Sequence, residues 1–108
     1  MTTITTKVCH DEGAGTEVTF YEGKDEVGKA STTAFGNKPN IFLYDVEVYE
    51  KFRNRGYGYT IVEYMINRYE VNTLHVSNDN IAAIRLYEKF GFRACARFND
   101  TIIMMVRE

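Results

Sequence analysis

The sequence predicts an α+β protein, an α/β layer in which two main helices pack against a mixed sheet. Strand-like segments fill the N-terminal half. After the glycines of "RNRGYGYT" (53–60), the apolar residues change from strand spacing to helical spacing. The resulting order is several strands, a helix, a strand, a second helix and two strands. Because the chain has only 108 residues and no repeat or linker-like stretch, we expect one domain over residues 1–108.

Four segments of the N-terminal half have strand composition: 2–6 (a short strand or a fraying end), 16–22, 26–35 and 40–50. Val18 and Phe20 alternate with polar neighbours, which is typical of a half-buried strand. The segment "EGKDE" suits a hairpin between the second and third strands. "FGNKPN" (35–40) predicts a loop, because its Gly, Asn and Pro each disturb regular structure.

The C-terminal half predicts two helices and three strands. The first helix ends near Asn72 and has an apolar face made of Ile61, Val62, Met65, Ile66 and Tyr69. The second has Asp79 or Asn80 as its N-cap, stops at Gly91, and turns inward Ile81, Ile84, Leu86, Tyr87 and Phe90. The strands are 73–77, "FRACARF" (92–98) and "TIIMMVR" (101–107), the last two joined by a turn with Asn99 and Asp100.

Composition excludes several classes of protein. A net charge of −2 argues against a nucleic-acid surface, and no apolar run is long enough for a membrane span. The start lacks a secretory pattern, so we expect a cytoplasmic protein. Cys9 and Cys95 form no disulfide framework and are expected to be reduced, with Cys95 packed in the interior rather than acting as a nucleophile. His10 and His75 share no metal-ligand spacing, so we expect no metal.

The segment "RNRGYG" (53–58) is suited to binding a pyrophosphate. A strand that enters a glycine-containing turn and then a helix gathers unpaired amide N–H groups, and the helix dipole favours an anion there. Gly56 and Gly58 let the backbone approach a ligand closely, and Arg53 and Arg55 add charge-assisted contacts. The alternative is an ordinary tight turn between a strand and a helix, because glycine pairs are common in turns.

A second motif favours the phosphate interpretation. Residues 76–92, "VSNDNIAAIRLYEKFGF", contain N-x-x-A-I-x-L-Y-x-K-x-G-F, and residues 53–58 contain R-x-x-G-x-G. In this order, with a helix and a strand between them, the two motifs resemble the GNAT superfamily of acyl-coenzyme A-dependent N-acyltransferases, over roughly residues 40–106. The resemblance implies a mixed, mostly antiparallel sheet with two main helices, and acetyl-CoA (coenzyme A) as a co-substrate without a metal.

The resemblance also implies which residues bind coenzyme A. Backbone amides of the loop and first helical turn would hold the pyrophosphate, at Arg53, Asn54, Arg55, Gly56, Tyr57, Gly58, Tyr59 and Thr60. Thr60 would add its hydroxyl. The strand "DVEV" (45–48), through Val46 and Val48, would pair with the pantetheine arm, and the strand 73–77 would diverge from it. Asn80 would bind the pantetheine or the adjacent phosphate region, and Tyr87 would lie beside the sulfur.

For the chemistry, the resemblance implies direct attack by an amine in a ternary complex. The backbone N–H of Val46 or Glu47 would stabilise the oxyanion, and Tyr87 would protonate the departing sulfur. Spacing alone also allows an alternative role for Tyr87, as a half-buried aromatic residue whose hydroxyl is hydrogen-bonded. Asp45 is our first choice of base, with Glu47 beside it, because strand alternation puts both on one face. The alternative is that both are solvated strand residues.

The chain departs from the family in one place. Family members have two helices between their first and second strands, whereas here only "CHDEGAGTEV" (9–18) is available, so this first helical pair is expected to be reduced or missing. An open groove would then accept a protein or peptide amine, or a second subunit would complete the acceptor site.

We therefore expect an N-acetyltransferase acting on a small-molecule or protein amine; a polyamine, an aminoglycoside, lysine and a protein N-terminus all fit. The alternative is a non-catalytic GNAT-fold protein that docks a partner, with or without coenzyme A. A third hypothesis is a nucleotide-binding module of another fold. We expect the last strand to offer an edge for a homodimer, since short folds gain from extra buried area.

Overall fold

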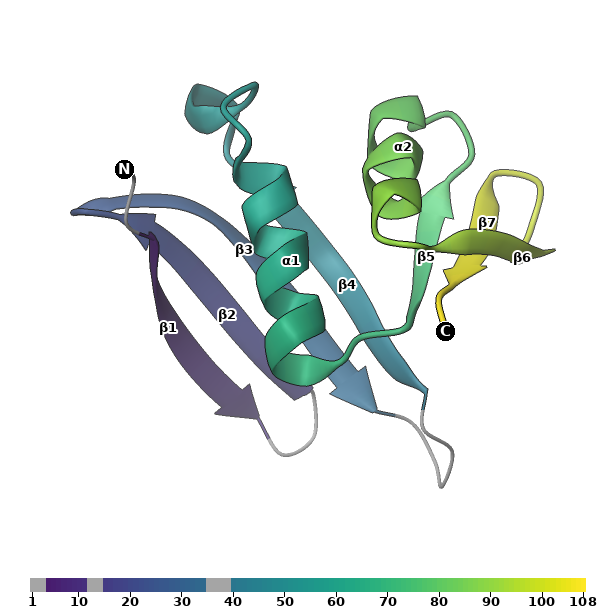
Figure 1. Ribbon diagram of the computed structural model, residues 1–108, viewed down its shortest axis with the longest axis horizontal. Coiled ribbons are helices and arrows are strands. Elements are labelled where there is room, and N and C mark those ends of the chain that lie inside the picture. The colour runs from purple at the N-terminus through teal and green to yellow at the C-terminus, as the bar shows by residue number, and fades with distance from the viewer. Residues whose placement is uncertain (1–3, 12–14, 35–39) are drawn as a thin grey trace.

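The computed structural model describes residues 4–11, 15–34 and 40–108, and its sheet confirms the predicted α+β class (Figure 1). Seven strands have the order β1-β2-β3-β4-β5-β7-β6, and only β4 and β5 pair in parallel. The strands are β1 (Ile4–Asp11), β2 (Gly15–Glu22), β3 (Asp25–Ala34), β4 (Ile41–Val48), β5 (Thr73–Ser77), β6 (Arg93–Arg97) and β7 (Ile102–Val106). The helices are the 3₁₀ turn η1 (Glu50–Phe52), α1 (Tyr57–Tyr69) and α2 (Ile81–Lys89). None of these helices is long and apolar enough to cross a membrane.

The first two strands form a hairpin, which confirms that the first helical pair is missing. Their antiparallel register runs without interruption from Ile4 opposite Glu22 to Asp11 opposite Gly15. Only residues 12–14 connect the strands, and these lie outside the described part of the chain, as do most residues of the loop predicted at 35–40. The first strand is longer than the predicted 2–6 because its pairing with β2 continues to Asp11.

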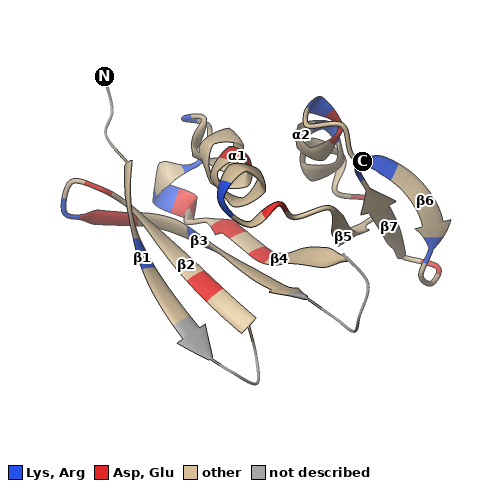
Figure 2. Cartoon of the chain, turned by 60° about the horizontal axis from the view of Figure 1, so that its bottom comes forward, with Lys and Arg blue, Asp and Glu red and all other residues tan. Residues whose placement is uncertain are grey.

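Both helices cover the same face of the sheet (Figures 1 and 2). The predicted apolar face of α1 is confirmed: Ile61, Val62 and Met65 are almost completely buried, and they join a core that includes Val18 and Phe20 of β2. Burying a side chain of this size contributes about 1.5–3 kcal/mol, so the α1 face is a main source of stability. The opposite face of β1–β4 carries no helix (Figure 2).

Helix α2 begins and ends at the predicted residues. Asn80 is the N-cap, and its Oδ1 accepts a hydrogen bond from the Ala83 N–H at 3.2 Å. Gly91 has φ of 90°, and Phe92 N–H donates to the Tyr87 carbonyl at 3.2 Å, which completes a Schellman C-cap. Ile81 was predicted to face inward, but it is 52% exposed because it is the first residue of the helix, on a turn that nothing covers.

Three other expectations are corrected. Helix α1 ends at Tyr69 rather than near Asn72, because Glu70 adopts φ of 58° and closes the helix. The last strand, β7, is not an edge, since β6 pairs along its outer side. Cys95 is exposed rather than packed, because no residue of the edge strand β6 is covered on either face.

Strands β4 and β5 are joined at one end and separate at the other. Their pairing consists of Phe42 opposite Thr73 and Leu43 opposite Leu74. Asn72 holds this end closed: its N–H donates to the Ile41 carbonyl at 2.8 Å, and its Oδ1 accepts from the Ile41 N–H at 3.0 Å. Beyond Leu43 the two strands part, as the sequence resemblance implied, and the candidate site lies in the opening.

Candidate active site

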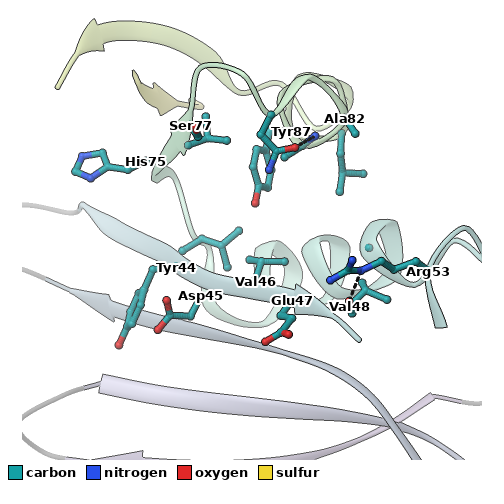
Figure 3. A pocket seen from close by; sticks show the side chains of 16 residues that line it. Tyr44, Asp45, Val46, Glu47, Val48, Arg53, His75, Ser77, Ala82 and Tyr87 are labelled. Carbon is teal, nitrogen blue, oxygen red and sulfur yellow. Dashed lines mark hydrogen bonds between the residues drawn. The ribbon is translucent and has the colours of Figure 1, made fainter. Parts of the chain in front are cut away.

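A cleft of about 740 Å³ occupies the opening between β4 and β5 (Figure 3). Its walls come from residues 43–48 of β4, residues 75–77 of β5 and the inner face of α2. Arg53, at one end of the cleft in Figure 3, and Gly58 also line it. This volume is within the range of small-molecule sites, about 300–1,000 Å³.

The edge of β4 that faces the cleft parts from β5 after Leu43. Among the described residues, β5 pairs with β4 only at Phe42 and Leu43, so it leaves the backbone edge of residues 45–47 open to a ligand. The strand also contains a β-bulge, in which Asp45 and Val46 together lie opposite Ala30 of β3, and Asp45 has φ of 52°. Bulges redirect side chains and are frequent next to active sites.

The two glycines of the loop have different roles. Gly56 is the N-cap of α1 with φ of 85°, a conformation that L residues rarely adopt, and a Cβ there would meet nothing within 4 Å. Gly58 lies inside the first turn, where a Cβ would be 3.4 Å from Leu86 Cδ2. Gly56 therefore makes the turn, whereas a Cβ at Gly58 would be in ordinary van der Waals contact with Leu86 of α2.

The two arginines of the loop lie in different surroundings. Arg53 lines the cleft, and its Nε donates to the Val48 carbonyl at 2.9 Å (Figure 3). Arg55 does not line this cleft; its guanidinium lies 5.7 Å from the centre of the Phe52 ring, beside a separate hollow that contains Glu22. Only Arg53 is thus positioned to contact a ligand in the cleft.

The structure narrows the set of free amides in the predicted phosphate loop. The Arg53 N–H donates to Glu50 O at 3.3 Å, and the Thr60 N–H donates to Gly56 O at 3.2 Å, so neither is free for a phosphate. The Thr60 hydroxyl also bonds to Gly56 O, at 3.3 Å, and Thr60 lines hollows away from the cleft. The first-turn amides, those of residues 57–59, lack partners by helix geometry. Asn54, with φ of 65°, shapes the loop before them.

Tyr87 contributes a phenol to the cleft from α2. Its ring is buried, it extends from α2 toward β4 (Figure 3), and it packs edge-on against Phe92 at 5.9 Å. Burial raises the pKa of the Tyr87 phenol. No described residue hydrogen-bonds to its hydroxyl, which lies in the cleft. Asn80, at the start of the same helix, lines the cleft with its Oδ1 engaged in the cap.

Asp45 and Glu47 are exposed and point to the side of β4 away from Tyr87 (Figure 3). They share a side, as strand alternation predicted, although the bulge makes the strand irregular between them. The carboxylates and the phenol therefore flank the open strand from opposite faces of the sheet.

His75 is a cleft residue that sequence reasoning considered only as a metal ligand. It is exposed on β5, stacks on Phe98 with ring centres 4.9 Å apart, and meets the edge of Phe42 at 6.0 Å. Its place two residues before Ser77, on the strand expected to diverge, was the signal that could have identified it. Among the side chains that the structure describes, no group of three His, Cys, Asp or Glu residues could hold a metal ion.

Comparison with known proteins agrees with this geometry. Residues 5–92 match the acetyltransferase (GNAT) family. The chain belongs to this family. No curated protein sequence matches this GNAT chain.

Solved structures share the GNAT fold of the chain at low identity. A GNAT family acetyltransferase from Elizabethkingia anophelis with acetyl-CoA bound has a TM-score of 0.82 at 15% identity, with 97% of each chain covered. A Bacillus subtilis acetyltransferase in complex with CoA has a TM-score of 0.82 at 14% identity, covering 98% of this chain and 99% of its own. The Escherichia coli ribosomal-protein-S18-alanine N-acetyltransferase has a TM-score of 0.77 at 19% identity, covering 99% and 93%. At these identities the likeness concerns the fold.

Proposed function

We propose that this GNAT chain is an N-acetyltransferase that transfers the acetyl group of acetyl-CoA to a primary amine by direct attack in a ternary complex. The observation that carries the proposal is the edge of β4 at residues 45–47, which β5 leaves open and which borders a cleft that is also lined by Tyr87. Two similar folds have acetyl-CoA or CoA bound, which supports the same co-substrate here.

The cleft fits the two recognisable parts of coenzyme A. The pantetheine arm is an extended diamide, and it would add to β4 as a strand, using the backbone groups that β5 leaves unpaired. The pyrophosphate would lie at the N-terminus of α1, against the free amides of residues 57–59 and the positive end of the helix dipole. The open space at Gly56 leaves room for this approach, and the remaining N–H groups of Arg53 supply charge.

Acetyl-CoA supplies the thioester whose carbonyl carbon is attacked. The Val46 and Glu47 amides would stabilise the negative charge that develops on the carbonyl oxygen. As the C–N bond forms and the C–S bond breaks, Tyr87 would donate its proton to the sulfur. The ordinary pKa of a phenol is about 10 and that of a thiol about 8.5, and burial raises the pKa of Tyr87 further. The proton would therefore pass to the sulfur only when the two groups are held together, which the cleft would do. Asp45 would accept the proton of the attacking amine, and Glu47 is the second candidate for this base.

The acceptor would approach from the helix-free face of the sheet, where Asp45 and Glu47 project. Without the first helical pair this side is open, so a protein or peptide amine can reach it as well as a small one. One similar fold acts on a ribosomal protein, which supports including a protein N-terminus among the candidate acceptors.

Turnover tests the proposal directly. Acetyl-CoA is incubated with a polyamine, an aminoglycoside, lysine and peptides with free N-termini, and the loss of thioester absorbance is followed together with the mass of the acetylated product. A thiol reagent is unsuitable, because Cys9 and Cys95 are exposed and would react with it. An acetylated product with any of these acceptors supports the proposal. Tight binding of CoA without turnover on any acceptor would favour the binding-protein alternative, and no binding of CoA would overturn both.

A further inference from the structure

Tyr59, which is exposed, and Phe90, which is partly buried, form an aromatic pair between the two helices. Tyr59 comes from the first turn of α1, and Phe90 is the C-cap of α2. Their ring centres are 4.6 Å apart with an interplanar angle of 39°, and Tyr59 is 45% exposed. A large aromatic ring at the surface with one face covered and the other open to solvent has room for a second flat group on its free face.

The pair lies next to the end of the cleft where the pyrophosphate is proposed to bind. Tyr59 follows Gly58, which lines the cleft, and is three residues from the N-cap Gly56. Residues three apart share a helix face and are separated by about 4.5 Å along the axis. Phe90 is likewise one turn beyond Leu86, which lines the cleft and approaches Gly58. A group one ribose away from a phosphate at the start of α1 can therefore reach the aromatic pair.

We propose that Tyr59 and Phe90 form a stacking platform for the adenine of coenzyme A, with Tyr59 as the contacting ring and Phe90 as its support. This inference rests on the proposed function and gives the Tyr59 side chain a role distinct from that of its backbone amide.

The backbone beneath the platform is fixed before any ligand binds. The Phe90 N–H donates to the Tyr87 carbonyl at 3.0 Å, and the Phe90 carbonyl accepts from Arg107 Nε at 2.9 Å. A platform that is already ordered avoids the entropic cost of arranging loose side chains on binding. Stacking is tolerant of base identity because every base has a π-face, so the platform selects for the presence of a base rather than for adenine in particular.

The consequence is a preference for CoA thioesters over thioesters of phosphopantetheine, which end at the first phosphate and carry no base. The experiment therefore compares two ligands, CoA and 4′-phosphopantetheine, by calorimetric titration of the wild type and of Tyr59→Ala. Tyr59→Phe retains the ring and is the matched control, and Glu63→Ala removes an exposed side chain one turn further along α1. Phe90→Leu tests the supporting ring with a smaller risk of unfolding than alanine, and circular dichroism checks the fold of each variant.

Loss of a base–aromatic contact weakens binding by about 1 kcal/mol or more, so we expect Tyr59→Ala to raise the Kd for CoA about fivefold or more. The Kd for 4′-phosphopantetheine is expected to stay the same, and Tyr59→Phe and Glu63→Ala to match the wild type with both ligands. An unchanged Kd for CoA in Tyr59→Ala, or equal weakening of both ligands, would overturn the platform while leaving the acetyltransferase proposal intact. If the wild type bound neither ligand, the proposed function itself would fail.

Discussion

Tyr87 illustrates how neighbouring residues decide what one side chain can do. Its carbonyl is held by the Phe92 amide of the C-cap, and its ring packs against Phe92, so the phenol is fixed by the same short segment that ends α2. Burial raises the pKa of the phenol, which keeps it protonated throughout the neutral range. A rigid, protonated hydroxyl at an open strand edge is what a proton donor to a leaving group requires.

Replacing Tyr87 by phenylalanine removes that proton donor without removing the ring. General acid catalysis contributes about 10²–10⁴-fold, so we expect kcat of Tyr87→Phe to fall by at least the lower figure while the KM for acetyl-CoA changes little. Steady-state kinetics on the accepted amine measures this. Tyr21→Phe, on β2 and away from the cleft, is the control and should retain wild-type kcat. Full activity in Tyr87→Phe would assign the proton transfer to another group.

Tyr49 offers a separate test of local electrostatics. Its hydroxyl donates to the Glu26 carboxylate, and this bond, burial and the charges of Glu26, Glu47 and Glu17 raise its pKa to about 12. Because the folded value lies above the unfolded value of about 10, the resulting stability is present below pH 10 and is lost as the pH rises toward 12. We expect tyrosinate absorbance to show a late-titrating component that Tyr49→Phe and Glu26→Gln both reduce. With no Trp in the chain, tyrosine dominates this signal. Unchanged titration in both variants would show that Glu26 does not act on Tyr49.

At the scale of elements, the turn that enters α1 combines a backbone requirement with an open surface. Gly56→Ala strains a residue with φ of 85° and adds a methyl group toward the proposed pyrophosphate. Gly23→Ala is a matched control, because Gly23 also has positive φ, of 61°, and open space around it, but lies in the β2–β3 turn. Left-handed backbone costs a non-glycine residue about 1–2 kcal/mol, so both variants should lose several degrees of Tm.

Of the two variants, only Gly56→Ala is expected to weaken CoA binding. Loss of one charge-assisted hydrogen bond to the pyrophosphate, about 1.4 kcal/mol, would raise the Kd about tenfold. Thermal denaturation and calorimetric titration of the two variants separate stability from binding. Equal CoA affinity in both would place the pyrophosphate elsewhere.

Replacing Asn72 tests what holds β4 and β5 together at the end where the two strands still pair. Its side chain accepts hydrogen bonds from the Ile41 N–H at 3.0 Å and from the Thr73 hydroxyl at 2.9 Å. Asn72→Ala leaves both donors without this acceptor, at a cost of about 1–3 kcal/mol, so we expect a drop in Tm of about 4 °C or more. Asn67→Ala, at an exposed position on α1, should stay within about 0.5 kcal/mol of the wild type. Equal denaturation midpoints would show that the parallel pair alone holds β4 to β5.

For the whole molecule, the helices and the carboxylates divide the sheet into two faces. Both helices and Tyr87 lie on one face, and Asp45 and Glu47 project from the other, so the opening between β4 and β5 connects them. A co-substrate held on the helix side and an amine arriving from the bare side would meet at the strand edge without competing for the same space. The absence of the first helical pair leaves this second face uncovered.

The free edge β6 is protected against pairing with another sheet. Arg93 and Arg97 stand at its two ends, and a bulge between Ala94 and Ala96 interrupts its register. Charged side chains and bulges are common devices that keep an exposed edge from pairing. Two antiparallel copies centred on Cys95 would also set Arg93 against Arg97, so self-association through this strand is disfavoured.

Signals contained within a few residues allowed correct predictions. The N-cap at Asn80, the stop at Gly91, the apolar face of α1 and the glycine turn at Gly56 each depend on local backbone conformation or on side-chain spacing along one element. The paired motifs at 53–58 and 80–92 likewise indicated the family, because each keeps its defining residues within one turn or one helix. Two expectations that depended on neighbours in space failed, the burial of Cys95 and the edge position of β7.

The sequence by itself determined which segments are strands and helices, and where α2 begins and ends. Tertiary structure alone decided that β4 and β5 pair at only two positions, that a bulge lies at Asp45, and that Arg53 faces the cleft while Arg55 does not. The physical reason is the range of the interactions. Capping, glycine turns and apolar periodicity act within one element, whereas strand register and the position of a side chain relative to a cleft depend on segments far apart in the chain.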